Sequence, residues 1–234
     1  MFRPLMVLLF LVAFAFAACG DDDEPSSQGS SDGAPAQTEE QAQQKESGGC
    51  ETVEAPAPKP DGGAKKPKRA LAAGAKYDVV MRTSCGEITI RLDQKTSPKT
   101  AASFANLVDT GFYDGTAFHR IVPGFVIQGG DPTGTGSGGP GYSTRDVPPQ
   151  DTVYTQGVVA MAKTATEPPG TSGSQFYIVT APDAGLPPEY AVLGKVVAGQ
   201  DVVDAIGELG DPASGGAGTP LQPVVIESAE LVKG

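Results

Sequence analysis

The sequence of 234 residues has no tryptophan, a single histidine and only three cysteines. No cluster of histidine, cysteine and aspartate has metal-ligand spacing, so the chain gives no indication of a metal site or of any cofactor. Basic residues are also in deficit, because 17 lysines and arginines face 28 aspartates and glutamates, for a formal net charge of -11. This charge argues against nucleic acid or an anionic lipid surface as a direct electrostatic partner.

Aromatic residues are scarce as well, at 6% of the chain, whereas there are 31 glycines and 21 prolines. This composition predicts that part of the chain lies outside a packed core. The length leaves room for one medium-sized domain with additional segments. The apolar run from Leu5 to Ala18 is too short to span a bilayer.

The first 18 residues are typical of a signal peptide, because Arg3 precedes an apolar run that suits the h-region. The run ends at Phe16-Ala17-Ala18, directly before Cys19, and acidic residues follow. Small residues before a cysteine resemble the bacterial lipoprotein signal, in which the cysteine is acylated, although Phe16 stands where leucine is usual. Cys19 is therefore the predicted lipidation site, and the chain is expected to be extracytoplasmic and lipid-anchored to a bacterial membrane. Plain secretion and a retained N-terminal anchor are the alternatives.

Residues 19–72 are predicted to be a lipidated N-terminus followed by a flexible tether. They contain almost no large apolar side chain, so they cannot bury enough surface to offset the entropy of ordering. A basic cluster at Lys65–Arg69 is expected to be a solvated part of this tether, although it would also suit an anionic surface.

Two cysteines remain if Cys19 carries lipid. Cys50 lies in the predicted tether and Cys85 in the turn Ser84-Cys85-Gly86. An even pair in an oxidising compartment favours a disulfide, which would contribute about 3–4 kcal/mol in the chain-entropy model. Two unpaired thiols are the alternative, because spacing alone does not establish connectivity.

Residues 73–234 are predicted to be the folded domain. The segments Tyr77–Thr83 and Glu87–Leu92 alternate between apolar and polar residues and predict a β-hairpin. Ser97 as N-cap and Pro98 at the first helical position predict a helix that Gly111 ends. Other strands are predicted at residues 157–162, 175–180, 191–197 and 224–231, and a second helix at 201–209. Many short strands and only two helices favour a closed antiparallel barrel.

The stretch from Phe118 to Asp131 is predicted to be one extended strand that Pro123-Gly124 interrupts. It combines Arg120 with a phenylalanine and Gln128, which would form a polar group at the rim of an apolar pocket. An ordinary core strand whose arginine reaches water fits the stretch alone equally well.

This stretch, FHRIVPGFVIQGGD, resembles the signature of the cyclophilin-type peptidyl-prolyl isomerases. Segments Val159–Lys163, Gly173–Ile178 and Leu193–Val196 agree with that family in order and spacing, and the resemblance runs from about Tyr77 to Val232. It implies a mainly β fold, a closed eight-stranded antiparallel barrel with an α-helix over each open end. It also implies isomerisation of X-Pro bonds in proline-containing unfolded or exported polypeptides, by a chain that we expect to be monomeric.

The resemblance also assigns site residues. Arg120 would be the catalytic hydrogen-bond donor, Gln128 would orient it, and Phe125 would form the floor of the proline pocket. The residues implied to bind substrate are Val126, Tyr177, Leu186 and Tyr190 as walls, with Ala162, Lys163 and Gln175 holding the peptide backbone.

Several positions depart from the family pattern. Tyr177 replaces a phenylalanine, Tyr190 a common histidine, Val126 a methionine and Lys163 an asparagine, and Gly185 precedes Leu186 where tryptophan is frequent. These departures weaken the expectation of tight cyclosporin binding more than that of catalysis. They also motivate a second hypothesis, a catalytically weak proline-binding module or chaperone of the same fold. A lipoprotein that captures small solutes is a third, but the domain looks too small for it.

Two features invite other interpretations. Residues 134–139 match the pattern G-x-G-x-x-G, but prolines follow instead of a helix, so we expect a surface loop and not a dinucleotide site. His119, the only histidine, invites a general-base role. Its parity is opposite to that of Arg120 and the rotation needs no proton transfer, so a structural role is favoured.

Overall fold

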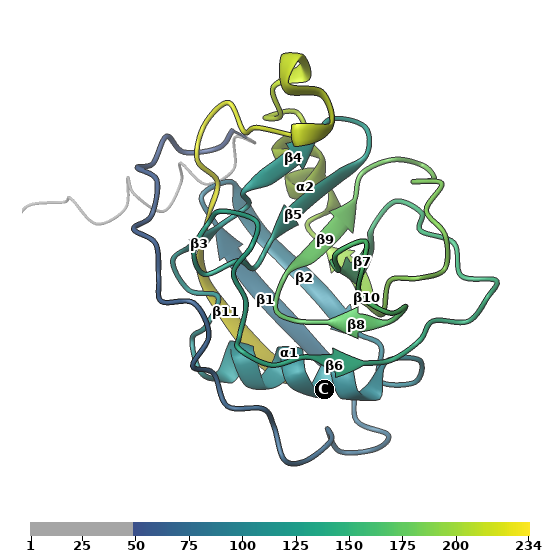
Figure 1. Ribbon diagram of the computed structural model, residues 1–234. Coiled ribbons are helices and arrows are strands. Elements are labelled where there is room, and N and C mark those ends of the chain that lie inside the picture. The colour runs from purple at the N-terminus through teal and green to yellow at the C-terminus, as the bar shows by residue number, and fades with distance from the viewer. Residues whose placement is uncertain (1–48) are drawn as a thin grey trace, which may run out of the picture. The chain divides into compact units, whose positions relative to one another are not determined.

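The computed structural model describes residues 49–234, and most of its regular structure is antiparallel β-sheet (Figure 1). One sheet has nine strands in the order β3-β11-β1-β2-β10-β7-β9-β5-β4. A second sheet pairs β6 with β8. The strands are β1 (Tyr77–Thr83), β2 (Gly86–Leu92), β3 (Thr116–Ala117), β4 (Arg120–Val122), β5 (Val126–Gly129), β6 (Thr144–Arg145), β7 (Val158–Met161), β8 (Thr171–Ser172), β9 (Phe176–Val179), β10 (Val192–Ala198) and β11 (Val225–Lys233).

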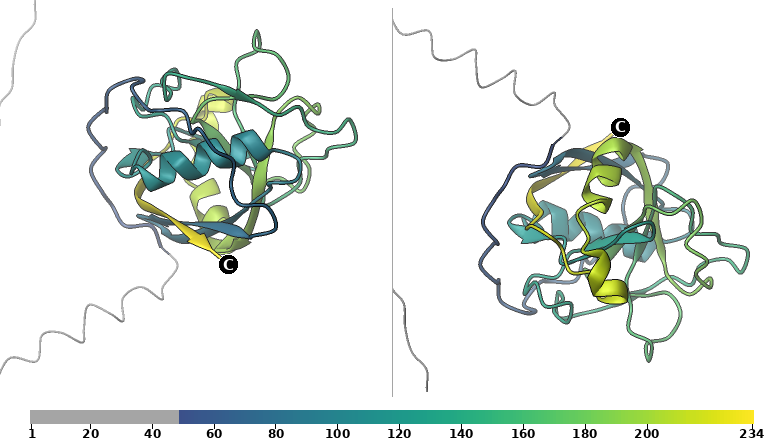
Figure 2. Two further views of the ribbon diagram at one scale, coloured as in Figure 1. Left: turned by 90° about the horizontal axis from the view of Figure 1, so that it is seen from below. Right: turned by 90° about the horizontal axis from the view of Figure 1, so that it is seen from above.

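Two α-helices lie at opposite ends of the curled sheet, as the two views of Figure 2 show. Helix α1 (Pro98–Asp109) packs against β11, whereas α2 (Gln200–Gly207) packs against β2, β4 and β5. A short 3-10 segment, η2 (Pro212–Ala217), lies beside β4. The two predicted helices are therefore confirmed, although Ser97 makes no side-chain capping hydrogen bond at α1.

The core follows from the alternation of the hairpin strands. Val79 pairs with Ile90 and Met81 with Ile88, and all four side chains are completely buried inside the curled sheet. The intervening residues point outward, as a strand with one buried face requires. Phe104 of α1 stacks on Tyr113 and meets Phe176 of β9 edge to face, which closes this core at the α1 end.

The structure corrects the prediction of one extended strand between Phe118 and Asp131. The segment folds back on itself, and β4 pairs antiparallel with β5 so that Arg120 lies opposite Gln128. The turn at Pro123-Gly124 causes this reversal, because Gly124 adopts a left-handed conformation with φ of 65°. The hairpin brings two predicted site residues, eight positions apart in sequence, onto neighbouring strands.

The structure supports a mainly β, antiparallel fold, but its strand count differs from the predicted eight. The nine-stranded sheet has β3 at one edge and β4 at the other. These edge strands are neighbours in the chain, because only Phe118 and His119 separate them.

Residues 49–72, which we call the N-terminal strap, differ from the prediction of a flexible tether. They run along the surface of the domain without regular secondary structure (Figure 1). Backbone hydrogen bonds join Lys59 to Pro132, Gly62 to Gly139 and Ala64 to Pro140, with N···O distances of 2.8, 2.9 and 3.1 Å. The composition argument failed because bonds to an already folded domain, and not burial of the strap's own side chains, supply the order.

A lysine fixes the middle of the strap. The Nζ of Lys59 donates to the carbonyl oxygens of Gly111, Phe112 and Asp114 at 3.3, 3.0 and 2.6 Å. These carbonyls lie just beyond the C-terminal end of α1, where the helix dipole favours a positive charge. The strap therefore has an electrostatic anchor as well as backbone pairing.

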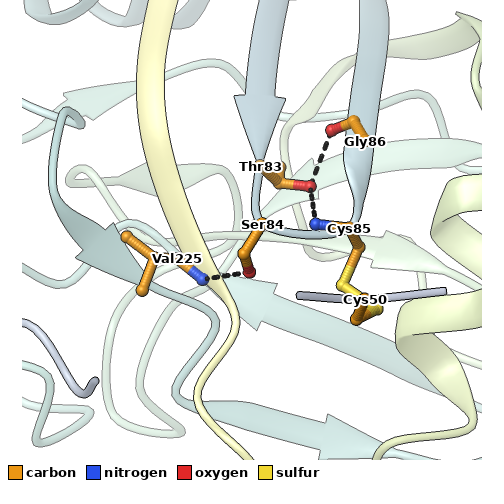
Figure 3. The surroundings of a disulfide bond; sticks show 6 residues. All are labelled: Cys50, Thr83, Ser84, Cys85, Gly86 and Val225. Atoms are coloured by element: carbon orange, nitrogen blue, oxygen red, sulfur yellow. Dashed lines mark hydrogen bonds between the residues drawn. A yellow bond between two sulfur atoms is a disulfide. The ribbon is translucent and has the colours of Figure 1, made fainter. Parts of the chain in front are cut away.

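A disulfide joins the start of the strap to the β1–β2 turn. Cys50 and Cys85 are bonded, 35 residues apart in sequence, with their Cα atoms 3.9 Å apart (Figure 3). Thr83 supports this turn, because its Oγ1 accepts from the backbone N–H of Cys85 and donates to the carbonyl of Gly86. The predicted pair is thus the bonded pair, whereas Cys19 and the predicted signal peptide lie outside the described residues. Within residues 49–234, no helix is long and apolar enough to cross a membrane.

Candidate active site

Arg120 lies half-buried on β4, and its guanidinium is held on two sides. Its Nε and Nη2 donate to the carbonyl oxygen of Gly216 in η2 at 3.1 and 3.0 Å. On the other side, Nη1 donates to Oε1 of Gln128 at 3.4 Å. Burial lowers the pKa of Arg120 from its ordinary value, but a guanidinium that starts above about 12 remains charged at neutral pH.

Glycines allow η2 to approach β4 this closely. A Cβ on Gly218 would lie 2.7 Å from Val122 Cγ2 and 2.9 Å from Arg120 Cγ, and the residue has a φ of +66°. The carbonyl of Gly218 also accepts from the backbone N–H of Ile121 at 2.7 Å. Only glycine fits at position 218 without strain. The glycine-rich segment Pro212–Gly218 can therefore lie close enough to β4 to support Arg120.

Gln128 is the first of two glutamines in a hydrogen-bonded series. Its Nε2 donates to Oε1 of Gln175 at 3.0 Å. The Nε2 of Gln175 in turn donates to the carbonyls of Gly136 and Gly138 at 3.0 and 2.9 Å. The glycine-rich loop therefore orients Gln175, then Gln128, and through it Arg120.

The glycine-rich loop, residues 132–141, is itself held by the buried carboxylate of Asp131. This carboxylate accepts from the backbone N–H groups of Thr133, Gly136 and Gly138. Burial raises the pKa of Asp131, but these hydrogen bonds outweigh it and hold the pKa below its ordinary value. The loop is thus a support for site residues, and no helix follows it that would bind a pyrophosphate.

Nine of the ten predicted catalytic and substrate-binding residues line one cavity of about 240 Å³, which we call the proline pocket. The tenth, Gln175, bonds to Gln128 and lines the neighbouring cavity. The guanidinium carbon of Arg120 lies 6.0 Å from the centre of the Phe125 ring, so a charged donor stands beside an apolar floor. The nine lining residues are Arg120, Phe125, Val126, Gln128, Ala162, Lys163, Tyr177, Leu186 and Tyr190.

Tyr177 and Tyr190 form the aromatic side of this pocket, and a third tyrosine packs against both. Tyr190 meets Tyr177 edge to face with ring centres 5.7 Å apart, and Tyr154 lies behind both. The hydroxyl of the fully buried Tyr154 donates to the carbonyl of Tyr190 at 2.6 Å and accepts from its N–H at 3.0 Å. Burial is the main reason why the pKa of Tyr154 rises to about 12, so it stays a neutral hydroxyl that fixes the Tyr190 backbone.

The hydroxyl of Tyr177 is buried and has no hydrogen-bond partner within the described residues. Burial raises its pKa strongly, so the group stays protonated. It stands where the resemblance leads one to expect phenylalanine. The wall of the proline pocket therefore contains one buried polar group that has no partner among the described residues.

Lys163 lines the proline pocket, but its charge is paired with an acidic residue. Its side chain is only 3% exposed, and Nζ forms an ion pair with Glu189 at 3.1 Å and lies 5.4 Å from the centre of the Tyr190 ring. This leaves Arg120 as the one cation of the proline pocket that has no acidic partner among the described residues.

His119 lies away from the proline pocket. It lines another cavity, of about 370 Å³, together with strap residues 55–58. Both ring nitrogens are buried without a hydrogen-bond partner within residues 49–234, and burial lowers the pKa of His119. Its place in a cavity that Arg120 does not line agrees with the predicted structural role.

Three supporting residues were missed by the sequence analysis: Gly216, Tyr154 and Asp61. Gly216 acts through a backbone carbonyl, which leaves no side-chain signal apart from the glycine-rich string itself. Tyr154 lies in a proline-rich region without periodicity. Asp61 of the strap accepts from the backbone N–H of Gly139 at 2.8 Å and lines the cavity beside the proline pocket, but it had been assigned to a tether.

Chemically, the site offers one charged donor beside an apolar pocket. Among the described residues, no group of three or more histidine, cysteine, aspartate or glutamate side chains is placed to hold a metal ion. Nor does a histidine, cysteine, aspartate or glutamate line the proline pocket. The arrangement therefore fits a reaction that needs hydrogen bonding and binding more than nucleophilic attack or proton transfer.

Comparison with known proteins agrees with this geometry. The family model of the cyclophilin-type peptidyl-prolyl cis-trans isomerases matches residues 78–231. Peptidyl-prolyl cis-trans isomerase B of Streptomyces anulatus is 41% identical over 166 residues, covering 63% of this chain and 92% of the relative. Peptidyl-prolyl cis-trans isomerase ppi1 of Schizosaccharomyces pombe is 39% identical over 156 residues, covering 65% of this chain and 97% of that protein.

A solved structure shares the fold. A cyclophilin-type peptidyl-prolyl cis-trans isomerase of Cryptosporidium parvum, crystallised in the presence of the dipeptide Ala-Pro, superposes with a TM-score of 0.60. It is 31% identical in sequence, and the match covers 66% of this chain and 98% of that one.

Proposed function

The chain belongs to the cyclophilin-type peptidyl-prolyl cis-trans isomerases, and we propose that it isomerises X-Pro bonds in the proline pocket, with Arg120 as catalytic donor. Proline-containing segments of unfolded polypeptides are the proposed substrates. The crystallisation of the Cryptosporidium parvum relative in the presence of Ala-Pro supports this choice of ligand.

The chemistry of rotation explains why one arginine suffices as the reactive group. The partial double bond of an X-Pro amide sets a barrier of about 18–20 kcal/mol. Twisting the amide breaks its conjugation and frees the nitrogen lone pair, which then accepts a hydrogen bond. An arginine N–H that donates to this lone pair stabilises the transition state and not the planar ground state.

The remaining stabilisation must come from the rest of the pocket. A million-fold acceleration requires lowering the barrier by about 8 kcal/mol. One charge-assisted hydrogen bond contributes only about 1.5–3 kcal/mol. Phe125 and Tyr177 therefore hold the proline ring, while Gln128, Gln175 and the backbone at Ala162 hold the flanking peptide during rotation.

The observation that carries this proposal is the state of the Arg120 guanidinium. Of its five N–H groups, three donate to Gly216 and Gln128, which fixes its plane. Two N–H groups remain for a ligand, at the rim of a cavity whose other lining residues are mostly aromatic or aliphatic. A preorganised donor of this kind costs little reorganisation when the twisted amide forms.

Arg120→Ala tests the proposal directly. We expect kcat/KM for cis-to-trans relaxation of an X-Pro peptide, followed without a coupled protease, to fall by about 10²-fold, as for loss of a transition-state donor. Arg82→Ala is the matched control, because Arg82 on β1 lies half-exposed beside Glu87 and Glu230. Equal turnover in wild type and Arg120→Ala would contradict the role of the arginine.

A catalytically weak binding module of the same fold is the second candidate. The tyrosines at 177 and 190 favour it, because they stand where the family pattern has phenylalanine and histidine, and the buried Tyr177 hydroxyl has no partner among the described residues. This candidate predicts that wild type binds an X-Pro peptide but relaxes it at the uncatalysed rate. Line-shape analysis of the cis and trans peptide resonances by NMR separates binding from turnover.

We also propose that the fold is a closed barrel of eight strands. If β3 and β4 are one strand interrupted at Phe118 and His119, the large sheet has eight strands. That combined strand would pair with β11 through Thr116 and Ala117 and with β5 through Arg120 to Val122. The hydrogen bond from the N–H of Phe118 to the carbonyl of Val224 supports continuity across the interruption. Slow hydrogen exchange at Phe118 would support closure, and rapid exchange there would oppose it.

The proposed cellular role rests mainly on the N-terminal sequence. We propose that the chain is a monomeric, extracytoplasmic lipoprotein, acylated at Cys19 after removal of residues 1–18, that assists folding of exported proteins. Support comes from the signal-like N-terminus, and the Cys50–Cys85 disulfide suits an oxidising compartment. Mass spectrometry of the N-terminal peptide tests the acylation, with Cys19→Ser as control, and light scattering tests the monomer. An unacylated mature peptide would contradict the lipid anchor.

A further inference from the structure

Three cavities adjoin one another on the described surface. The proline pocket shares Gln128, Ala162 and Lys163 with a second cavity of about 580 Å³, which we call the middle cavity. The middle cavity shares Ser143 and Glu167 with a third, of about 810 Å³, the distal cavity. The shared residues place the middle cavity between the other two, so the three form a series that leads away from the catalytic arginine.

The distal cavity is basic although the chain is acidic. Three cations come from the strap, and Lys99 at the start of α1 and Arg145 of β6 face the same cavity. Glu167 is its only acidic lining residue among those described, and its carboxylate accepts two hydrogen bonds from Thr164. The strap cations are Lys66, Lys68 and Arg69.

The strap is fixed where it passes this cavity. The Nζ of Lys66 donates to the carbonyl of Ser143 at 2.8 Å, and the backbone carbonyl of Lys65 accepts from Nδ2 of Asn106 at 3.0 Å. Ala64 pairs with Pro140 just before them. The basic cluster predicted to be part of a solvated tether thus lines a cavity, and the backbone at its start is already ordered before a ligand binds.

We propose that the distal cavity binds acidic side chains of the same polypeptide whose X-Pro bond occupies the proline pocket. The proposal rests on the proposed function and extends it to substrate selection. One observation points to a polypeptide: the shared lining residues connect the distal cavity, through the middle cavity, with the proline pocket. The excess of positive charge in the distal cavity selects for carboxylates.

The test compares three X-Pro peptides. One carries a short run of glutamates on the amino side of the X-Pro unit, one carries it on the carboxyl side, and one carries glutamines instead. The variant is Lys68→Gln with Arg69→Gln, two exposed cations outside the proline pocket. The matched control is Lys76→Gln with Lys195→Gln, which removes the same charge at exposed positions that line none of the three cavities.

For wild type at low salt, we expect a lower KM for the glutamate peptide of one polarity only, because the distal cavity lies on one side of the pocket. The double strap variant should raise that KM about fivefold and leave kcat and the glutamine peptide unchanged, as expected for two exposed charge pairs. Salt at about 1 M, where the Debye length is about 3 Å, should abolish the preference. The control variant should behave as wild type.

Other outcomes overturn the inference. Equal KM values for all three peptides, or an equal loss in the control variant, would show that the distal cavity does not select substrate. Binding of the full chain to phosphatidylglycerol vesicles, lost in the strap variant while peptide kinetics stay unchanged, would assign the cavity to a membrane surface instead. Turnover of the glutamine peptide by wild type reports on the proposed function separately, since its absence would contradict catalysis and not the cavity.

Discussion

The proline pocket and the N-terminal strap are built in opposite ways, although both reach the glycine-rich loop. The pocket takes four of its nine lining side chains from strands β4, β5 and β9 and the others from adjoining turns and loops, and its cation is fixed by side-chain and carbonyl partners. The strap has no regular secondary structure and is held by backbone pairing, by side-chain hydrogen bonds of Lys59, Asp61 and Lys66, and by one disulfide. The difference separates two sources of order: side-chain packing in the pocket and attachment to a finished surface in the strap.

The two regions are coupled through the glycine-rich loop. Asp61 of the strap holds Gly139, and the carbonyls of Gly136 and Gly138 in the same loop hold Gln175. Gln175 then orients Gln128 beside Arg120. If the strap is only an attachment, loosening it should cost stability first and catalysis second.

The largest expected effect comes from cutting the strap's covalent attachment with Cys50→Ser and Cys85→Ser together. The disulfide closes a loop of 35 residues, so we expect the free energy of unfolding to fall by about 3–4 kcal/mol. Denaturant unfolding under oxidising conditions measures this. Turnover of a neutral X-Pro peptide should persist below the transition, because the pocket's own strands are intact.

The wild-type protein under reducing conditions is the control for this prediction, since reduction should reproduce the effect without a substitution. A parallel loss of turnover, at denaturant concentrations where the fold is retained, would contradict the independence of the pocket from the strap.

A smaller effect, now confined to the pocket, is expected from Gly218→Ala. The new Cβ would meet Val122 and Arg120 Cγ at a backbone position with positive φ, and we expect a loss of stability of about 2 kcal/mol. Because the clash displaces η2, Arg120 should lose the Gly216 carbonyl and kcat should fall by about tenfold.

Gly216→Ala serves as the comparison for this variant. Nothing lies within 4 Å of a Cβ added at Gly216, so the substitution keeps the carbonyl and should leave kcat near wild type. An equal fall of kcat in both variants would show that η2 acts through flexibility and not through the close approach at Gly218.

The sequence predicts the residues of the proline pocket but not the ordered state of the strap. The hairpin of β1 and β2 follows from alternation. The family resemblance assigned ten site residues, and the structure brings nine of them around one pocket with Gln175 beside it, because most of them lie on a strand or next to one. The sequence analysis missed that Arg120 and Gln128 lie on paired strands, although Pro123-Gly124 is ordinary turn chemistry. It misjudged the strap because backbone hydrogen bonds of residues such as Gly62 leave no trace in composition.

Tyr177→Phe is expected to have a small stabilising effect, opposite in sign to that of Gly218→Ala. It removes a buried hydroxyl that has no partner among the described residues, so the free energy of unfolding should rise by about 1 kcal/mol. Thermal unfolding measures this. Tyr154→Phe is the control and should lose stability, because it breaks both hydrogen bonds to Tyr190. A loss of stability in Tyr177→Phe would imply that its hydroxyl is satisfied in solution.

The smallest effect concerns His119, which faces the strap and not the proline pocket. Its folded-state pKa is lowered by burial, so the unfolded chain binds a proton more readily than the folded chain. Stability should therefore fall as pH drops below the unfolded value of about 6.5, and level off below the folded value. His119→Gln should remove this slope in denaturant unfolding.

The Asp131 carboxylate, whose pKa is depressed, affects stability in a lower pH range. Its stabilisation is present at neutral pH and is lost only as pH falls below about 4. The two windows thus separate on the pH axis. Meanwhile kcat/KM for a neutral peptide should stay flat across pH 6–8, since rotation transfers no proton and Arg120 remains charged. A fall of kcat/KM with a midpoint near 6.5 that His119→Gln abolishes would instead give the histidine a part in turnover, and would tie the strap side of the molecule to the chemistry of the pocket.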